Sequence, residues 1–162
     1  MFIRTASERD LTAIRTLLVE TWHATYDAIY GVGRVTEITD NSHSVMSLRA
    51  RLSRPNSEFL VADDGQRLGG VAFAEAIDGG EQVVLRQLYV LPGLQGRGIG
   101  GMLLDEVIDS FPEARGIRAE VAAENSKAIA FYEANGFART ADVGEHASAS
   151  EPTLVLRRSL AG

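Results

Sequence analysis

The chain has 162 residues, 45% of them hydrophobic, and a formal net charge of −6. These values are typical of one soluble globular domain, which we expect to span residues 1–162. The sequence contains no cysteine, which excludes disulfides and thiol nucleophiles, and its three scattered histidines predict no metal site. An acidic chain whose only adjacent basic pair is Arg157-Arg158 is a poor partner for nucleic acid. No apolar stretch approaches the roughly twenty residues of a membrane span, so we expect a cytoplasmic protein without membrane contact.

Helices and then strands are predicted in the first half. After a short N-terminal strand, Ser7 to Asp10 resemble a capping box, and apolar residues recur at helical spacing from Leu11 until Gly31. Residues 42–52 predict a second helix, whereas residues 36–40 fit no clear pattern. Three strands separated by Asp-Gly turns then predict an antiparallel meander over residues 59–62, 68–77 and 82–90.

The second half alternates strands and helices. Residues 99–111 predict a helix stopped by Pro112, residues 116–122 a strand, and residues 125–135 a helix closed by Gly136. Residues 137–143 and 153–160 predict closing strands around a polar loop, residues 144–152, that we expect to be mobile. The pattern indicates one α/β domain with a mixed sheet.

Four glycines cluster where the helix after the strand ending at Val90 is predicted to begin: Gly96, Gly98, Gly100 and Gly101. Residues without side chains let a phosphate approach the main chain, and the free N–H groups of a helix start attract it. The segment is therefore a candidate phosphate-binding turn.

Two familiar interpretations of these glycines fit poorly. Gly96-x-Gly98-x-x-Gly101 matches the dinucleotide fingerprint, and Glu120 follows at about the distance of a ribose-binding acid. However, residues 91–95 separate the strand from the first glycine, and too little chain follows for the remaining units of a dinucleotide domain. A P-loop is also unsuitable, because no Lys-Ser or Lys-Thr follows the glycines.

The segment Gln95-Gly-Arg-Gly-Ile-Gly100 resembles the Q/R-x-x-G-x-G/A motif of the Gcn5-related N-acetyltransferase (GNAT) family. A second segment, Asn125-Ser-Lys-Ala-Ile-Ala-Phe-Tyr-Glu-Ala-Asn-Gly-Phe137, resembles another signature of that family at the expected separation. The resemblance implies a mixed, mostly antiparallel twisted sheet with about four helices and a splayed pair of parallel strands.

The resemblance also implies acetyl-coenzyme A (acetyl-CoA) as cosubstrate, without a metal. Its pyrophosphate would contact the turn at Gln95, Gly96, Arg97, Gly98, Ile99, Gly100 and Gly101. For Arg97, a solvated position in the loop is an equal alternative to a direct phosphate contact. The pantetheine arm would pair with the main chain of Leu88, Tyr89 and Val90, and Asn125 would bond the arm or cap its helix.

Two residues are candidates for proton transfer. In the family, a tyrosine at the position of Tyr132 protonates the departing thiolate, although an aromatic residue on this helix face could also be core. Glu120 matches the base of some family branches, acting directly or through a water, and could equally be an exposed strand residue. Glu75 and Glu81 are weaker alternatives.

The acceptor is left open by the sequence. The resemblance implies direct attack by a primary amine of a small molecule or a peptide. Trp22, Tyr26 and Tyr30 share one helix face and predict either core or the lining of an acceptor pocket. A noncatalytic sensor of acyl-CoA with the same fold is the alternative, and a homodimer is left open.

Overall fold

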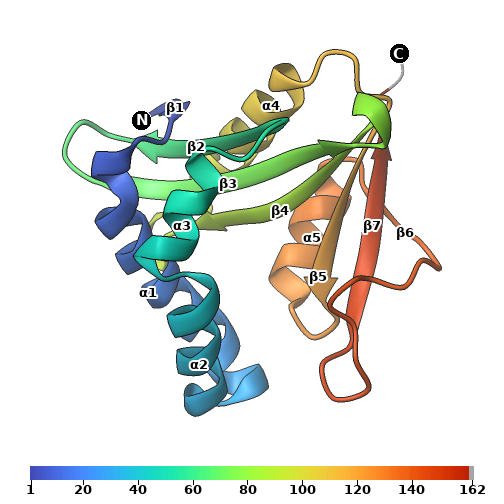
Figure 1. The fold of residues 1–162 in the computed structure, drawn as a ribbon. Coiled ribbons are helices and arrows are strands. Elements are labelled where there is room, and N and C mark those ends of the chain that lie inside the picture. The colour runs from blue at the N-terminus through green and yellow to red at the C-terminus, as the bar shows by residue number, and fades with distance from the viewer. Residues whose placement is uncertain (161–162) are drawn as a thin grey trace.

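A computed structural model of the chain describes residues 1–160 as a seven-stranded open sheet flanked by helices (Figure 1). The strand order is β1-β2-β3-β4-β5-β7-β6, and only β4 and β5 are parallel. The strands are β1 (Phe2–Thr5), β2 (Ser57–Asp63), β3 (Leu68–Ile77), β4 (Gln82–Val90), β5 (Gly116–Ala122), β6 (Ala138–Arg139) and β7 (Thr153–Ser159). The helices are α1 (Leu11–Tyr30), α2 (Val32–Ser42), α3 (Val45–Leu52), α4 (Ile99–Ser110) and α5 (Ser126–Ala134). The predicted fold class is confirmed.

The alternation of side chains along the strands builds a core on each face of the sheet. In β2, Phe59 and Val61 pack with α1 and α3, whereas Leu60 and Ala62 pack with α4. Ile14 and Leu18 of α1 are completely buried in the first core, and Leu103 of α4 in the second. The sheet therefore separates α1–α3 from α4 and α5.

Two elements differ from the sequence prediction. Residues 32–42 form α2, so the described chain has five α-helices and not about four. The segment is mostly polar, and of its three apolar residues, Val32, Val35 and Ile38, only Val35 is completely buried, so its sequence gives a weak helical signal. The predicted strand over residues 137–143 is only Ala138–Arg139. The N–H and hydroxyl of Thr140 both donate to the Val155 carbonyl, and the chain leaves the sheet after this residue.

The parallel strands β4 and β5 separate after a short contact. Their pairing extends from Gln82–Gly116 to Leu85–Ala119, after which β5 pairs only with β7. At this point Arg86 is an extra residue in β4, because Leu85 pairs with Ala74 and Gln87 pairs with Phe73. Such a bulge bends a strand. The two strands therefore diverge, as Figure 1 shows.

Within residues 1–160, none of the helices is both long and apolar enough to cross a membrane. The same residues contain no group of three or more metal-ligating side chains.

Asp10 is a buried carboxylate that anchors the start of α1, and we expect Asp10→Asn to destabilise the fold. Asp10 accepts two hydrogen bonds of 2.8 Å from Arg4 and one from the Ser7 N–H. These bonds, the Arg4 bonds above all, hold the pKa of Asp10 well below its ordinary value. The variant should lose about 2 kcal/mol of unfolding free energy, or roughly 4–8 °C in melting temperature at pH 7.

A lowered folded-state pKa stabilises the fold above the unfolded value of about 4, and this contribution disappears as the pH falls further. The difference between wild type and Asp10→Asn should therefore shrink in melting curves recorded between pH 5 and about pH 2. Asp40→Asn is the control, because Asp40 pairs with Arg15 but its side chain is 60% exposed. An equal loss of stability in both variants would contradict the assignment.

Candidate active site

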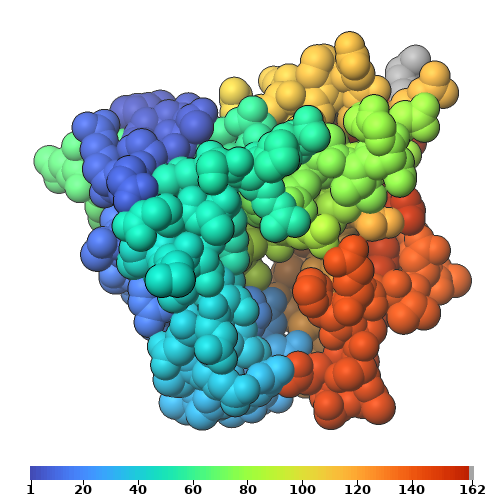
Figure 2. Space-filling view, viewed as in Figure 1, coloured from blue at the N-terminus to red at the C-terminus, as the bar shows by residue number. Residues whose placement is uncertain are grey.

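A cleft of about 740 Å³ opens where β4 and β5 diverge. Its walls come from α1, the second half of β4, the turn before α4, the end of β5 and the start of α5. Figure 2 shows the surface hollowed between α2 and the loop that joins β6 to β7 (residues 140–152, the β6–β7 loop). All but one of the predicted site residues line the cleft, the exception being Arg97.

The glycine turn presents a helix start to the cleft. Gly96 and Gly98 have φ values of +80° and +83°, a left-handed conformation that side chains disfavour. Gly98 precedes α4, and its carbonyl accepts the N–H of Met102, so the preceding N–H groups of the first turn have no partner within the helix. Arg97 is exposed and forms no ion pair within residues 1–160. The turn can bind an anion through its main chain.

Gly100 has a different role in the same turn. A Cβ atom at Gly100 would lie 3.0 Å from the ring of Phe131, so the glycine allows α4 to approach α5 closely. This approach brings the N-terminal ends of both helices to the same cleft, which Gly100 and Phe131 both line.

The main chain of β4 contributes hydrogen-bonding groups to the gap. Leu91 N–H donates to the Gly69 carbonyl, and the residues that bond a neighbour alternate along an antiparallel strand. The main chain of Tyr89 is therefore directed toward β3, and that of Leu88 and Val90 toward the gap. One of these groups is already used, because the Gln95 side chain donates to the Val90 carbonyl over 3.1 Å. Tyr89 contributes its side chain to the cleft.

Tyr132 lies in α5 with its ring fixed by aromatic packing. Phe131 and Phe137 contact it edge-on, at centroid distances of 5.3 and 5.1 Å. The residue is 7% exposed, and no hydrogen bond to its hydroxyl exists within residues 1–160. Burial, and to a lesser degree Tyr26, raises the pKa of Tyr132 above its ordinary value. The hydroxyl therefore stays protonated and can donate to a group in the cleft.

Asn125 caps α5 and connects it to α1. Its side-chain oxygen accepts the Ala128 N–H at 3.2 Å, and its amide donates to the Tyr26 hydroxyl at 3.2 Å. The N-cap interpretation is thus confirmed, and the amide donor is engaged by Tyr26.

The aromatic face of α1 is mostly packed inside the fold, and a role in binding the acceptor stays a prediction. Trp22 packs inside, with its ring 5.3 Å from that of His43. Tyr26 lies between Trp22 and Tyr30, with its ring tilted against that of Trp22 at 4.4 Å and stacked on that of Tyr30 at 5.4 Å, and it lines the cleft. Trp22 and Tyr26 therefore pack into the core, Tyr26 also forms part of the cleft wall, and Tyr30 lies outside the cleft lining.

Glu120 lies on β5 at the edge of the cleft, with one carboxylate oxygen engaged. Its Oε2 accepts the His146 N–H and the Thr153 hydroxyl, both at 2.8 Å. Neither bond involves Oε1, so this oxygen can accept a proton. The alternatives are less suitable, because Glu75 is held by Arg54 and Arg86 and Glu81 is exposed before β4, outside the lining of the cleft.

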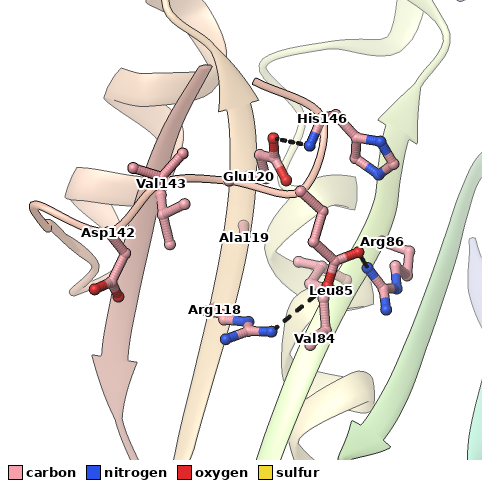
Figure 3. A pocket seen from close by; sticks show the side chains of 12 residues that line it. Val84, Leu85, Arg86, Arg118, Ala119, Glu120, Asp142, Val143 and His146 are labelled. Atoms are coloured by element: carbon pink, nitrogen blue, oxygen red, sulfur yellow. Dashed lines mark hydrogen bonds and ion pairs between the residues drawn. The ribbon is translucent and has the colours of Figure 1, made fainter. Parts of the chain in front are cut away.

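A smaller hollow of about 100 Å³ adjoins the cleft and contains two arginines that the sequence analysis did not single out (Figure 3). Arg86 is the bulge residue of β4, and Arg118 lies on β5. Both approach Glu145 of the β6–β7 loop. A charged residue directly after the apolar run Val83-Val84-Leu85, in the middle of the predicted strand, was the available signal for Arg86.

A sheet split beside a glycine-rich helix start forms an extended site for a ligand with an anionic end. Residues 12–137 match the acetyltransferase (GNAT) family. Since this match covers most of the chain, the chain belongs to that family, as its two motifs predicted.

Individual relatives agree with the fold. The chain is 40% identical over 81 residues to the [ribosomal protein bS18]-alanine N-acetyltransferase of Salmonella typhimurium, covering 48% of this chain and 51% of that protein. It is 36% identical over 81 residues to a probable N-acetyltransferase of Mycobacterium tuberculosis, covering 50% of this chain and 46% of that protein. The chain thus spans about half the length of these curated relatives. The PaiA N-acetyltransferase of Thermoplasma acidophilum, solved with coenzyme A, superposes with a TM-score of 0.87 over 98% of both chains at 24% identity.

Proposed function

We propose that the protein transfers an acetyl group from acetyl-CoA to a primary amine. The observation that carries this proposal is the cleft itself. It combines unpaired helix N–H groups, main-chain groups of β4 facing a gap, and the protonated Tyr132 hydroxyl. Acetyl-CoA has a matching sequence of groups, because its pyrophosphate, pantetheine arm and thioester follow one another along an extended chain.

The donor would bind through the main chain more than through side chains. Residues 96–101 would hold the pyrophosphate at the start of α4. Leu88 and Val90 would pair with the amides of the pantetheine arm, as an added strand does. A main-chain N–H in the gap would then stabilise the negative charge on the thioester oxygen during attack.

Proton transfer is assigned to two side chains. The attacking amine must lose a proton, which Oε1 of Glu120 accepts directly or through water. Nitrogen forms a bond to the acetyl carbon as the carbon–sulfur bond breaks, and the departing thiolate receives the proton of Tyr132. A direct attack needs no covalent enzyme intermediate, in keeping with a chain that has no cysteine.

A protein N-terminal amine belongs among the acceptors to be tested, because a relative that is 40% identical over 81 residues is named for acetylating an alanine of ribosomal protein bS18. Small amines form the second group of the panel. The assay follows release of the coenzyme A thiol with each acceptor, together with the melting temperature with acetyl-CoA alone.

We expect thiol release that requires both acetyl-CoA and an amine. A raised melting temperature without turnover on any amine would favour a noncatalytic sensor of acyl-CoA. The absence of a thermal shift with acetyl-CoA would overturn the donor site.

A further inference from the structure

Two arginines and one glutamate form an ion cluster in the small hollow beside the cleft. Glu145 Oε2 lies 3.0 Å from Arg86 Nη1, and Glu145 Oε1 lies 3.8 Å from Arg118 Nη2 (Figure 3). Arg86 and Arg118 come from neighbouring strands, since Val84 pairs with Arg118 across the parallel register. A single carboxylate therefore bridges both guanidinium groups.

Arg86 is held more firmly than the glutamate. Arg86 donates its Nε–H to Glu75 at 2.9 Å, and Glu75 is only 7% exposed. This bond fixes the guanidinium so that its outer nitrogen faces the hollow. Arg118 has no other ion pair within residues 1–160. Glu145 lies in the β6–β7 loop with a side chain that is 56% exposed, so releasing it costs little free energy.

The position of the hollow connects it with the acceptor. The hollow and the cleft share Leu85, Arg86 and Glu120 in their linings. A group bound between the two arginines therefore lies beside the carboxylate that we assign to the acceptor amine.

Charge favours an anion in this position once Glu145 has left. The other acidic groups of the hollow are Glu120, which accepts two hydrogen bonds, and Asp142, which pairs with Arg157 at 2.7 Å. His146 is the remaining titratable lining residue. Both arginines would then lack a direct carboxylate partner inside the hollow.

We infer that Arg86 and Arg118 recognise a carboxylate of the acceptor, and that Glu145 occupies this position in the free protein. The inference rests on the proposed acetyl transfer and names its substrate class as an amine that carries an acidic group near the reacting nitrogen. The carboxylate is the side chain of an acidic residue, either beside a peptide N-terminus or in a free acidic amino acid. Replacement of Glu145 by the acceptor would exchange one bridging carboxylate for another.

The test compares acceptors that differ only in charge. Peptides beginning Ala-Glu, Ala-Gln and Ala-Lys, together with free glutamate and glutamine, are assayed for kcat/KM. Their binding to the protein saturated with coenzyme A is measured by calorimetry, which does not depend on turnover. We expect at least one glutamate acceptor to exceed its glutamine counterpart by roughly tenfold, as a charged hydrogen-bonded pair implies. The peptide and free amino acid arms identify the source of the carboxylate.

Substitutions in the hollow test whether its arginines cause this preference for glutamate acceptors. Arg118→Gln should abolish the preference for glutamate, and Glu145→Gln should raise kcat/KM for the acidic acceptor about threefold by removing the competing carboxylate. Arg34→Gln is the matched control, since Arg34 pairs with Glu151 of the same loop but lies outside the hollow. It should leave the preference unchanged.

The outcomes separate the two proposals. Equal binding of glutamate and glutamine acceptors, or a preference that survives Arg118→Gln, would overturn the inference. Binding of the acidic peptide that depends on Arg118, without any acetylation, would support the inference and count against acetyl transfer.

Discussion

Replacing Tyr132 with phenylalanine is expected to lower kcat about a hundredfold, the usual contribution of a positioned general acid. The substitution removes one hydroxyl and preserves the ring that packs against Phe131 and Phe137. Because the hydroxyl has no protein partner within residues 1–160, its loss leaves no buried group unsatisfied. Affinity for acetyl-CoA, measured by calorimetry, should stay within about twofold of wild type.

Tyr30→Phe is the control for this variant. Tyr30 stacks on Tyr26 at 5.4 Å but does not line the cleft, so its kcat should match that of wild type. Wild-type kcat should also show no loss from Tyr132 ionisation up to about pH 10, because burial raises the pKa of this residue above its ordinary value. If Tyr132→Phe kept the wild-type kcat, another group would have to protonate the thiolate.

Gly98→Val should weaken acetyl-CoA binding at least tenfold. Gly98 has a φ of +83°, and a β-branched residue there costs about 1–3 kcal/mol of backbone strain. Relief of that strain would rotate the main chain just before α4 and redirect the N–H groups that we assign to the pyrophosphate. Calorimetric titration with acetyl-CoA measures the loss, and a melting curve without ligand shows that the variant is folded.

Gly93→Ala tests whether any substitution in this turn is harmful. Gly93 lacks a positive φ, and a Cβ atom there would meet nothing within 4 Å. Its acetyl-CoA affinity should therefore stay within about twofold of wild type. Unchanged binding by a folded Gly98→Val variant would place the anionic end of the cosubstrate elsewhere.

The sequence predicted those features that depend on neighbouring residues. The Asp-Gly turns between strands, the antiparallel meander that they connect and the Asn125 cap all follow from local chemistry, and each appears in the structure. The family motifs identified the part of the cleft formed by the turn before α4 and by α5 for the same reason, since each motif is a single continuous segment.

Features that depend on distant residues were not predictable. Helix α2 owes its place to the burial of Val35 beneath α1, which its polar sequence does not reveal. The engagement of Glu120 requires the β6–β7 loop to return from 26 residues away. The meeting of Arg86, Arg118 and Glu145 depends on the strand order, so their spacing in the chain gives no signal. Mobility of the loop over residues 144–152 stays a prediction.

The bulge at Arg86 changes which alternate side chains of β4 face the core. Before it, Val83 and Leu85 face the core beneath α4; after it, Leu88 and Val90 do. Deleting this one residue would move the side chains of the rest of the strand to the opposite face of the sheet, whereas changing its side chain would leave their direction unchanged. The main chain of the extra residue therefore sets which side chains in the second half of β4 face the core, whereas its guanidinium pairs with Glu75 and Glu145. A substitution at this position would change those ion pairs and leave the direction of Leu88 and Val90 unchanged.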